Sequence, residues 1–144
     1  MKKFPPVEKV YEAWTALADN RVKLHEGYAD VSSSNGEKAY VVKFSGDQYS
    51  SDDNATFWRG YPGYPVLAVL MLQGKLPYDA REAELWKNIN WTQTNKIHKN
   101  NYAEAVKAIA GERGINLTTA EEAANKVMEA LTVLPLEIKR KIKS

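Results

Sequence analysis

Histidine and carboxylate side chains offer the most direct acid–base chemistry in this 144-residue chain, which has two histidines and no cysteine. His25 is followed by Glu26 and then by Asp30, so a histidine–carboxylate pair could move protons there. If the segment is a strand, neighbouring side chains point to opposite faces, and His25 and Glu26 cannot both line one pocket. A small enzyme that uses His25 with Glu26 or Asp30 is therefore one hypothesis, and it requires a concave pocket beside the strand.

Other catalytic and metal-binding patterns are absent from the sequence. The lack of cysteine excludes disulfides, thiolate nucleophiles, thiolate-bound zinc and iron–sulfur clusters. No His-Glu-x-x-His, Gly-x-Ser-x-Gly or Gly-rich phosphate-binding pattern occurs. Residues 47–54 are rich in oxygen ligands but lack the order of a calcium loop, so we expect a solvated loop. We therefore expect no metal and no cofactor.

An aromatic turn at residues 57–65 is the most unusual segment of the chain. It reads Phe-Trp-Arg-Gly-Tyr-Pro-Gly-Tyr-Pro, a rigid bend that cannot bury every ring. Aromatic rings beside an arginine suit stacking on bases, proline-rich peptides or sugars, although rings at such a bend also commonly cover the edge of a core. The main hypothesis is a non-enzymatic module that binds a protein or peptide partner. Its candidate binding residues are Trp58, Arg59, Tyr61 and Tyr64.

The charge distribution supplies an alternative hypothesis, nucleic-acid binding. The formal net charge is only +2, but residues 1–74 carry 8 basic and 9 acidic groups (net −1) and residues 75–144 carry 12 and 9 (net +3). A phosphate backbone is contacted mainly by such basic side chains, although a solvated helix face has the same composition. Trp86 and Trp91 are interleaved with the basic residues from Lys87 to Lys99, and we expect the two rings to anchor the core. The candidate residues are Lys87, Lys96, His98, Lys99, Lys139, Arg140, Lys141 and Lys143.

A helix-turn-helix pattern can be traced around Gly114, but its details argue against DNA binding. The second helix would carry Glu121, Glu122 and Glu129 with only Lys126 to meet phosphates. We therefore expect an ordinary pair of antiparallel helices, with Gly114 as the C-cap of the first.

The elements that position these residues begin with a helix and a sheet. Apolar residues at helical spacing predict an amphipathic helix over 7–18. Strands are expected over 21–32, with a bulge near Gly27, and over 38–45. Asn35-Gly36 between them is a strong hairpin signal. A third strand is expected over 55–61, which completes an antiparallel meander.

Helices are expected in the remainder of the chain. Residues 65–73 are apolar all round and should form a buried central helix. Capping patterns predict further helices over 80–88, 90–98, 102–112 and 119–132. In the last segment, 135–144, Ile138 and Ile142 are four residues apart, as on a helix. The expected fold is α+β, with an N-terminal helix on a three-stranded antiparallel meander followed by a bundle of about five short helices.

The chain is expected to form a single domain, 1–144, with a helix-and-sheet part at 1–63 and a helical part at 64–144. The longest apolar run, residues 66–72, is far shorter than the roughly 18–20 residues of a membrane span. The first residues lack the apolar stretch of a signal peptide. We therefore expect a cytoplasmic protein with no membrane partner, and the sequence does not predict its oligomeric state.

Overall fold

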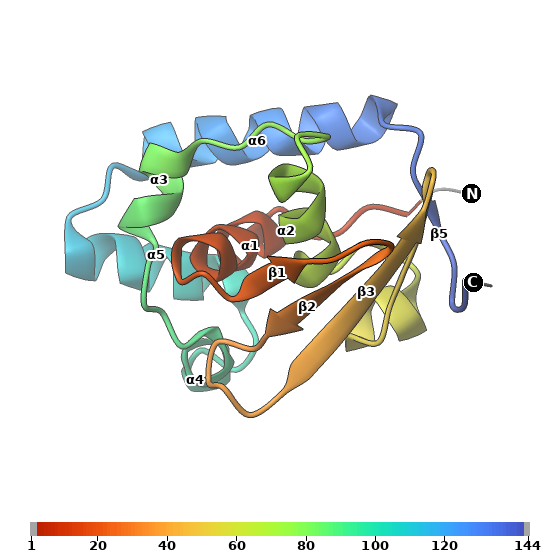
Figure 1. The fold of residues 1–144 in the computed structure, drawn as a ribbon. Coiled ribbons are helices and arrows are strands. Elements are labelled where there is room, and N and C mark those ends of the chain that lie inside the picture. Colours follow the sequence, from red (N-terminus) through yellow and green to blue (C-terminus); the bar gives the residue numbers. More distant parts are fainter. Residues whose placement is uncertain (1–2, 143–144) are drawn as a thin grey trace.

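The first helix packs its aromatic face inside the molecule. The computed structural model describes residues 3–142, and the predicted first helix is α1 (Glu8–Ala18). All residues from 10 to 16 are buried, because the helices that follow the sheet in the sequence pack around α1 (Figure 1). The ring of Tyr11 makes edge contacts with Trp14 and Trp86, with centroids 5.1 Å and 4.6 Å away.

The sheet has five strands in the order β1-β2-β3-β4-β5. Neighbours pair antiparallel from β1 to β4, and β5 pairs parallel with β4. The hairpin at Asn35-Gly36 is confirmed, since it joins β2 to β3. The predicted bulge near Gly27 is instead a tight turn with φ +81° at that glycine, so the first expected strand is two. The strands are β1 (Val22–Leu24), β2 (Tyr28–Ser32), β3 (Ala39–Ser45), β4 (Gln48–Ser51) and β5 (Glu137–Ile138).

Two predictions for the middle of the chain are wrong. The expected solvated loop contains β4, whose Tyr49 is buried between β3 and β5. The expected third strand at 55–61 is instead a single turn of π-helix, η1 (Ala55–Arg59). The side chain of Asp53 contacts the start of η1, because the backbone amide of Thr56 donates to Asp53 Oδ2 at 3.1 Å.

The predicted helices are confirmed, with ends that differ by a few residues. The expected N-cap residues Asp79, Asn90 and Asn101 each accept a hydrogen bond from a backbone amide in the first turn of their helix. The N-cap of the last helix is Asn116, slightly earlier than expected. Gly114 has φ +66° and ends the helix before it. These helices are α2 (Tyr64–Leu72), α3 (Ala80–Leu85), α4 (Trp91–Ile97), α5 (Tyr102–Arg113) and α6 (Leu117–Val133).

The core is centred on α2, whose side chains from Val66 to Leu70 are fully buried. One cluster of buried apolar side chains includes residues of α1, α2, the sheet and the later helices. The C-terminal segment does not form the helix that the Ile138–Ile142 spacing favoured. It crosses to the edge of the sheet and pairs with β4, at the opposite end of the molecule from α3 and α5 (Figure 1). The C-terminal segment therefore lies beside η1, although the two are far apart in the sequence.

Candidate functional site

A polar cleft of about 240 Å³ lies where α1, the β2–β3 hairpin, the segment before η1 and the α4–α5 connection meet. Its walls carry carboxylates, basic groups, amides, hydroxyls and aromatic rings, a mixture typical of binding sites for polar small molecules. The lining residues are Lys9, Glu12, Arg21, Ser33, Ser34, Tyr40, Asp53, Asn54, Ala55, Tyr64, Trp91, Thr92, Asn95, Asn100 and Tyr102. We refer to this set as the polar cleft.

Glu12 presents a buried carboxyl group from α1. The residue is 7% exposed, and its Oε2 lies 3.2 Å from Lys9 Nζ, one turn earlier on the same helix. Burial raises the pKa of Glu12, and the nearby Lys9 only partly opposes this effect. Burial acts to lower the pKa of Lys9, but Glu12 and Tyr102 more than offset it, so that pKa is raised. Lys9 Nζ also lies 4.7 Å from the centre of the Tyr102 ring.

Asp53 brings a second buried carboxylate, and only one of its two oxygens has a hydrogen-bond partner in the described residues. The residue is 5% exposed. Its Oδ2 accepts the Thr56 amide and lies so close to Gly63 that a Cβ there would be 2.2 Å away. Its Oδ1 is buried and has no hydrogen-bond partner within residues 3–142. A buried acceptor without a partner costs about 1–3 kcal/mol, and more when charged, so this oxygen is a strong candidate for ligand contact.

Arg21 places a guanidinium group at the same cleft. One of its terminal nitrogens donates to the backbone oxygen of Ser32, and its Nε lies 3.6 Å from Asp19 Oδ2. The other terminal nitrogen, Nη2, is buried and has no hydrogen-bond partner in the described part of the chain. The guanidinium also lies near the Tyr64 hydroxyl, whose pKa is raised by burial and lowered in smaller measure by Arg21. Arg21 and Asp53, which both line the polar cleft, therefore each carry a buried polar atom without a hydrogen-bond partner among residues 3–142.

Trp91 closes another wall of the cleft and is held rigidly. Its indole Nε1 donates to Thr15 Oγ1 at 2.8 Å. Its backbone amide donates to Ser34 Oγ at 2.9 Å, which fixes α4 to the hairpin turn. Because α1, the hairpin and α4 are joined through these contacts, the cleft is shaped by rigid elements rather than by a flexible loop.

The backbone around the cleft departs from regular structure in two places. The first is the π-helix η1, a rare conformation that is frequent at functional sites. The second is the α4–α5 connection, where Lys99 and Asn100 have φ of +53° and +63°. Consecutive left-handed residues other than glycine are uncommon and are enriched at ligand-binding sites.

The charges in the cleft nearly balance, since Lys9 and Arg21 face Glu12 and Asp53. Because two basic and two acidic side chains leave the cleft without net formal charge, it offers no net attraction to a strongly charged ligand. Within residues 3–142, no group of three or more histidine or carboxylate side chains could hold a metal ion.

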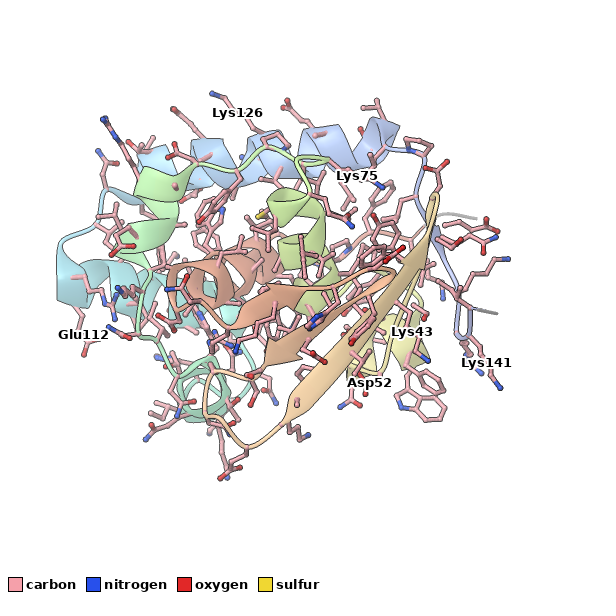
Figure 2. The ribbon with its side chains drawn as sticks, in the orientation of Figure 1. Lys43, Asp52, Lys75, Glu112, Lys126 and Lys141 are labelled. Carbon is pink, nitrogen blue, oxygen red and sulfur yellow. The ribbon has the colours of Figure 1, made fainter. Side chains whose placement is uncertain are left out.

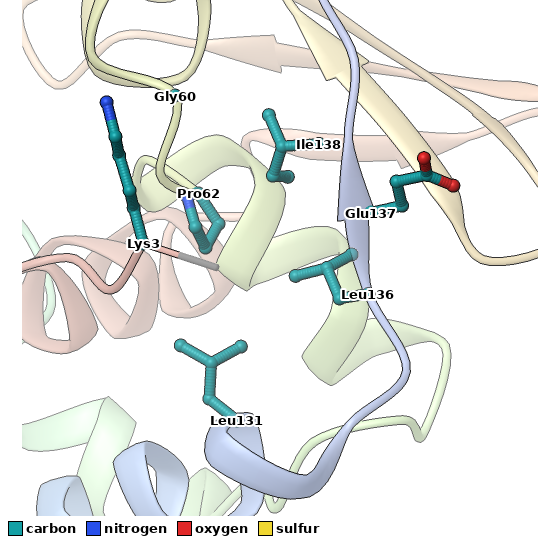
Figure 3. Close-up of a pocket in the computed structure, with 7 residues that line it drawn as sticks. All are labelled: Lys3, Gly60, Pro62, Leu131, Leu136, Glu137 and Ile138. Atoms are coloured by element: carbon teal, nitrogen blue, oxygen red, sulfur yellow. The ribbon is translucent and has the colours of Figure 1, made fainter. Parts of the chain in front are cut away.

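A second cavity, of about 310 Å³, offers less chemistry. It lies between η1, α6 and the C-terminal segment (Figure 3). Leu131, Leu136 and Ile138 face it, whereas the carboxylate of Glu137 points away from it (Figure 3). Lys3 and Glu137 are the charged residues of its lining, so this cavity brings together fewer polar side chains than the polar cleft and is the weaker candidate for recognising a polar molecule.

The structure separates the residues of the predicted aromatic turn. Tyr64 lines the polar cleft. Trp58 and Arg59 are exposed at the end of η1, and Tyr61 is half-buried after it. Of the predicted binding residues, Tyr64 therefore belongs to the cleft, whereas Trp58 and Arg59 belong to a separate surface.

The predicted basic residues are likewise dispersed. Trp86 and Trp91 are buried, as expected for core anchors. Arg140 and Lys141 lie beside η1, where Arg140 contacts the ring of Trp58. Lys139 forms an ion pair with Glu137 at 2.8 Å. Lys87, Lys96, His98 and Lys99 are on or near α3 and α4, and Lys143 lies outside the described residues.

The histidine–carboxylate pair predicted on the sheet is formed, but on an exposed face. His25 Nε2 lies 2.9 Å from Asp30 Oδ2, and both side chains are exposed. The His25 ring stacks on Tyr28 with centroids 4.6 Å apart. Glu26 is exposed in the turn that follows β1, and none of these residues is among those that line the polar cleft.

Sequence reasoning missed the polar groups of the cleft. Glu12 lies between apolar residues of the first helix, and a charged residue inside such a run was the available signal. Asp53-Asn54 immediately precedes a turn of helix, a position that favours capping side chains. Arg21 carried no local signal, because its role depends on contacts with residues distant in the sequence.

The chain belongs to the family described as uncharacterised conserved protein UCP014422, whose model matches residues 2–137. The match spans every residue of the polar cleft and ends before Arg140. No curated protein and no solved structure matches the chain. In the described part of the chain, no helix is both long and apolar enough to cross a membrane.

Proposed function

We propose that this protein is a cytoplasmic binding protein for a small polar molecule, which occupies the polar cleft. The observation that carries the proposal is the buried Asp53 Oδ1, which lacks a hydrogen-bond partner within residues 3–142. A ligand that donates a hydrogen bond to this oxygen would remove the cost of leaving it unsatisfied.

The surroundings define the chemistry of the ligand. Arg21 Nη2 is a buried donor at the same cleft without a hydrogen-bond partner in residues 3–142, so the ligand should present an acceptor as well as a donor. The balance of two basic and two acidic side chains favours a molecule without net charge. Tyr64 and Trp91 supply ring surfaces, which suit a planar group or the apolar face of a sugar. The cleft volume of about 240 Å³ limits the ligand to a single small molecule.

This proposal retains the sequence-based hypothesis of a non-enzymatic binding module but moves its centre. Tyr64 belongs both to the aromatic turn and to the cleft, whereas Trp58 belongs to the turn alone. The rigid support of Trp91 by Thr15 and Ser34 favours binding by a largely preformed site.

The test is a screen of sugars, nucleosides and amino acids by two-dimensional NMR of the ¹⁵N-labelled protein. The four tryptophan indole signals make the screen selective, since Trp91 lines the cleft and Trp58 lies outside it. The proposal predicts a ligand that shifts the Trp91 indole and the side-chain amides of Asn95 and Asn100 while the Trp58 indole is unchanged. Ligands that shift only signals outside the cleft would contradict it.

A further inference from the structure

Trp58 is the most unusual feature of the surface outside the polar cleft. Its side chain is 67% exposed, whereas the other three tryptophans are buried. It stands on η1, and its ring makes an edge contact with Phe57 at a centroid distance of 4.7 Å. Because most of this large ring lies outside the core, a partner that covers it would gain the free energy of burying apolar surface.

The C-terminal segment brings a guanidinium group to this ring. Arg140 Cζ lies 5.6 Å from the centre of Trp58 and 5.6 Å from the centre of Phe57, within the range of a cation–π interaction. The segment is held in place by the backbone, since the Lys139 amide donates to the Tyr49 oxygen at 2.8 Å. Arg140 is therefore positioned against the aromatic pair by its pairing with the sheet.

Further basic residues from distant parts of the sequence meet at the same place. Lys3 Nζ donates to the backbone oxygen of Arg59 at 3.2 Å. Lys43 and Lys141 line a groove of about 350 Å³ together with Phe57 and Arg140. Figure 2 labels Lys43 and Lys141 at the same end of the molecule.

Negative charge at this place is limited. Asp52 lines the groove, but its Oδ1 accepts a hydrogen bond from the Val41 amide. The nearby Glu137 is paired with Lys139. Basic side chains therefore exceed acidic ones around Trp58, and we call Lys43, Phe57, Trp58, Arg59, Arg140 and Lys141 the η1 surface.

We propose that the η1 surface binds single-stranded nucleic acid. An unpaired base stacks on the exposed face of Trp58, and Arg140 and Lys141 contact the adjacent phosphates. Aromatic platforms flanked by basic side chains are the usual means of binding single strands. A duplex fits less well, because its base faces are stacked inside the helix. An acidic peptide satisfies the charges but offers no planar face to Trp58.

Structure thereby joins two sequence features that were separate hypotheses, the aromatic turn and the basic C-terminal segment. The site is independent of the polar cleft, since none of its six residues lines that cleft.

The first experiment uses tryptophan fluorescence of the full chain titrated with oligo(dT) or oligo(U) at 50 mM salt. Trp58 is the single exposed tryptophan, so stacking should quench its emission, and the Trp58→Phe variant should lose the quenching. The proposal also predicts that affinity falls as salt rises, with a smaller salt slope for Arg140→Gln because one phosphate contact is lost. Absence of binding at 50 mM salt overturns the proposal.

The second experiment compares affinities of variants by anisotropy of a labelled oligonucleotide. Trp58→Ala should weaken binding about tenfold, since base–aromatic stacking contributes strongly to such sites. Ile97→Ala is the matched control for an exposed apolar side chain, also 67% exposed. Lys126→Gln controls for charge, and Figure 2 labels Lys126 on the opposite side of the molecule from Lys141; both controls should bind normally.

Three outcomes would overturn the proposal. One is equal weakening by Lys126→Gln and Arg140→Gln, which indicates non-specific attraction. Another is tighter binding of duplex than of single strands. The third is binding of poly-glutamate without binding of oligonucleotide, which indicates an acidic protein partner. Asn95→Ala, which alters the polar cleft from α4, should leave oligonucleotide binding unchanged, so failure at the η1 surface and failure at the cleft are distinguishable.

Discussion

The polar cleft and the η1 surface share the segment 53–64 but treat its side chains in opposite ways. In the cleft, polar groups such as Asp53 Oδ1 are buried without a hydrogen-bond partner in the part of the chain that the structure describes. On the η1 surface, the apolar ring of Trp58 is exposed to water. Each arrangement is unfavourable for stability in isolation. The difference teaches that one Gly- and Pro-rich bend can direct one ring, Tyr64, into a cleft and another, Trp58, out to the surface.

The largest effect that separates the two regions is expected from their tryptophans. Trp91→Ala should lower the free energy of unfolding by about 3–5 kcal/mol, because a buried ring is lost and Thr15 loses its indole donor. Trp58→Ala should change it by less than about 0.5 kcal/mol, as is usual for an exposed position. Chemical denaturation of both variants measures the contrast. Equal losses would show that the two rings share one structural role.

A glycine beside Asp53 provides the next contrast. Gly63→Ala should destabilise the protein by about 1–3 kcal/mol, because the new Cβ would lie 2.2 Å from Asp53 Oδ2. Gly111→Ala is the matched control, since no atom outside the local helix backbone lies within 4 Å of its added Cβ. In a helix this substitution should stabilise by about 0.5–1 kcal/mol. Thermal denaturation of both variants measures whether each substitution raises or lowers stability. A Gly63→Ala variant as stable as the wild type would mean that Asp53 can move aside without cost.

The pH dependence of stability should show the burial of Glu12. Its pKa is raised in the folded protein, so its stabilising contribution is fully present below the ordinary glutamate pKa of about 4.3 and decreases as pH rises through the raised pKa. The free energy of unfolding of the wild type minus that of Glu12→Gln should therefore fall with pH. Lys9 stays protonated over this acidic to neutral range, since its pKa is also raised.

Glu137 supplies a control of opposite sign. Lys139 lowers the pKa of Glu137, so its contribution is present above the ordinary glutamate pKa and is lost as pH falls through the lowered one. The free energy of unfolding of the wild type minus that of Glu137→Gln should therefore rise with pH. Denaturation at a series of pH values tests both, and a flat difference curve for Glu12→Gln would contradict its buried position.

The smallest effect concerns the contact that holds the C-terminal segment on the η1 surface. Arg140→Gln removes the cation from the rings of Phe57 and Trp58 and should cost at most about 1 kcal/mol, as is typical of exposed cation–π contacts. The loss should appear locally, as faster hydrogen exchange of the Lys139 amide, with little change in the core. Lys141→Gln should leave that exchange unaffected. Unchanged exchange in Arg140→Gln would show that backbone pairing alone holds the segment.

Local patterns in the sequence predict much of the fold. The Asn35-Gly36 turn fixes the β2–β3 hairpin, and Asn101 caps α5 as its spacing with Glu104 indicates. The errors arise where distant contacts prevail. Residues 55–59 include Thr, Phe and Trp, which favour strands, yet Asp53 caps them as a π-helix. The position of the polar strand β4 depends on pairing with β3 and with β5, which comes from the far end of the chain.

The candidate site was less predictable than the fold. Tyr64 was selected because rings concentrated in one bend are visible in sequence. Glu12 and Asp53 are exceptional only because tertiary packing buries them, and charged residues are otherwise mostly exposed. The proximity of Arg140 to Trp58 could not be predicted, since it depends on a parallel strand pair formed by the last residues.

Calorimetric titration of the ligand found by the NMR screen tests the central claim most directly, with wild type, Asp53→Asn and Asp52→Asn compared. Asn at 53 preserves the acceptor for the Thr56 amide but replaces the free carboxylate oxygen, so binding should weaken about tenfold or more. Asp52 is the adjacent exposed carboxylate outside the cleft, and its variant should bind like the wild type. Equal affinity of Asp53→Asn and wild type would contradict the account, because the unpartnered oxygen of Asp53 would then have no role in recognition.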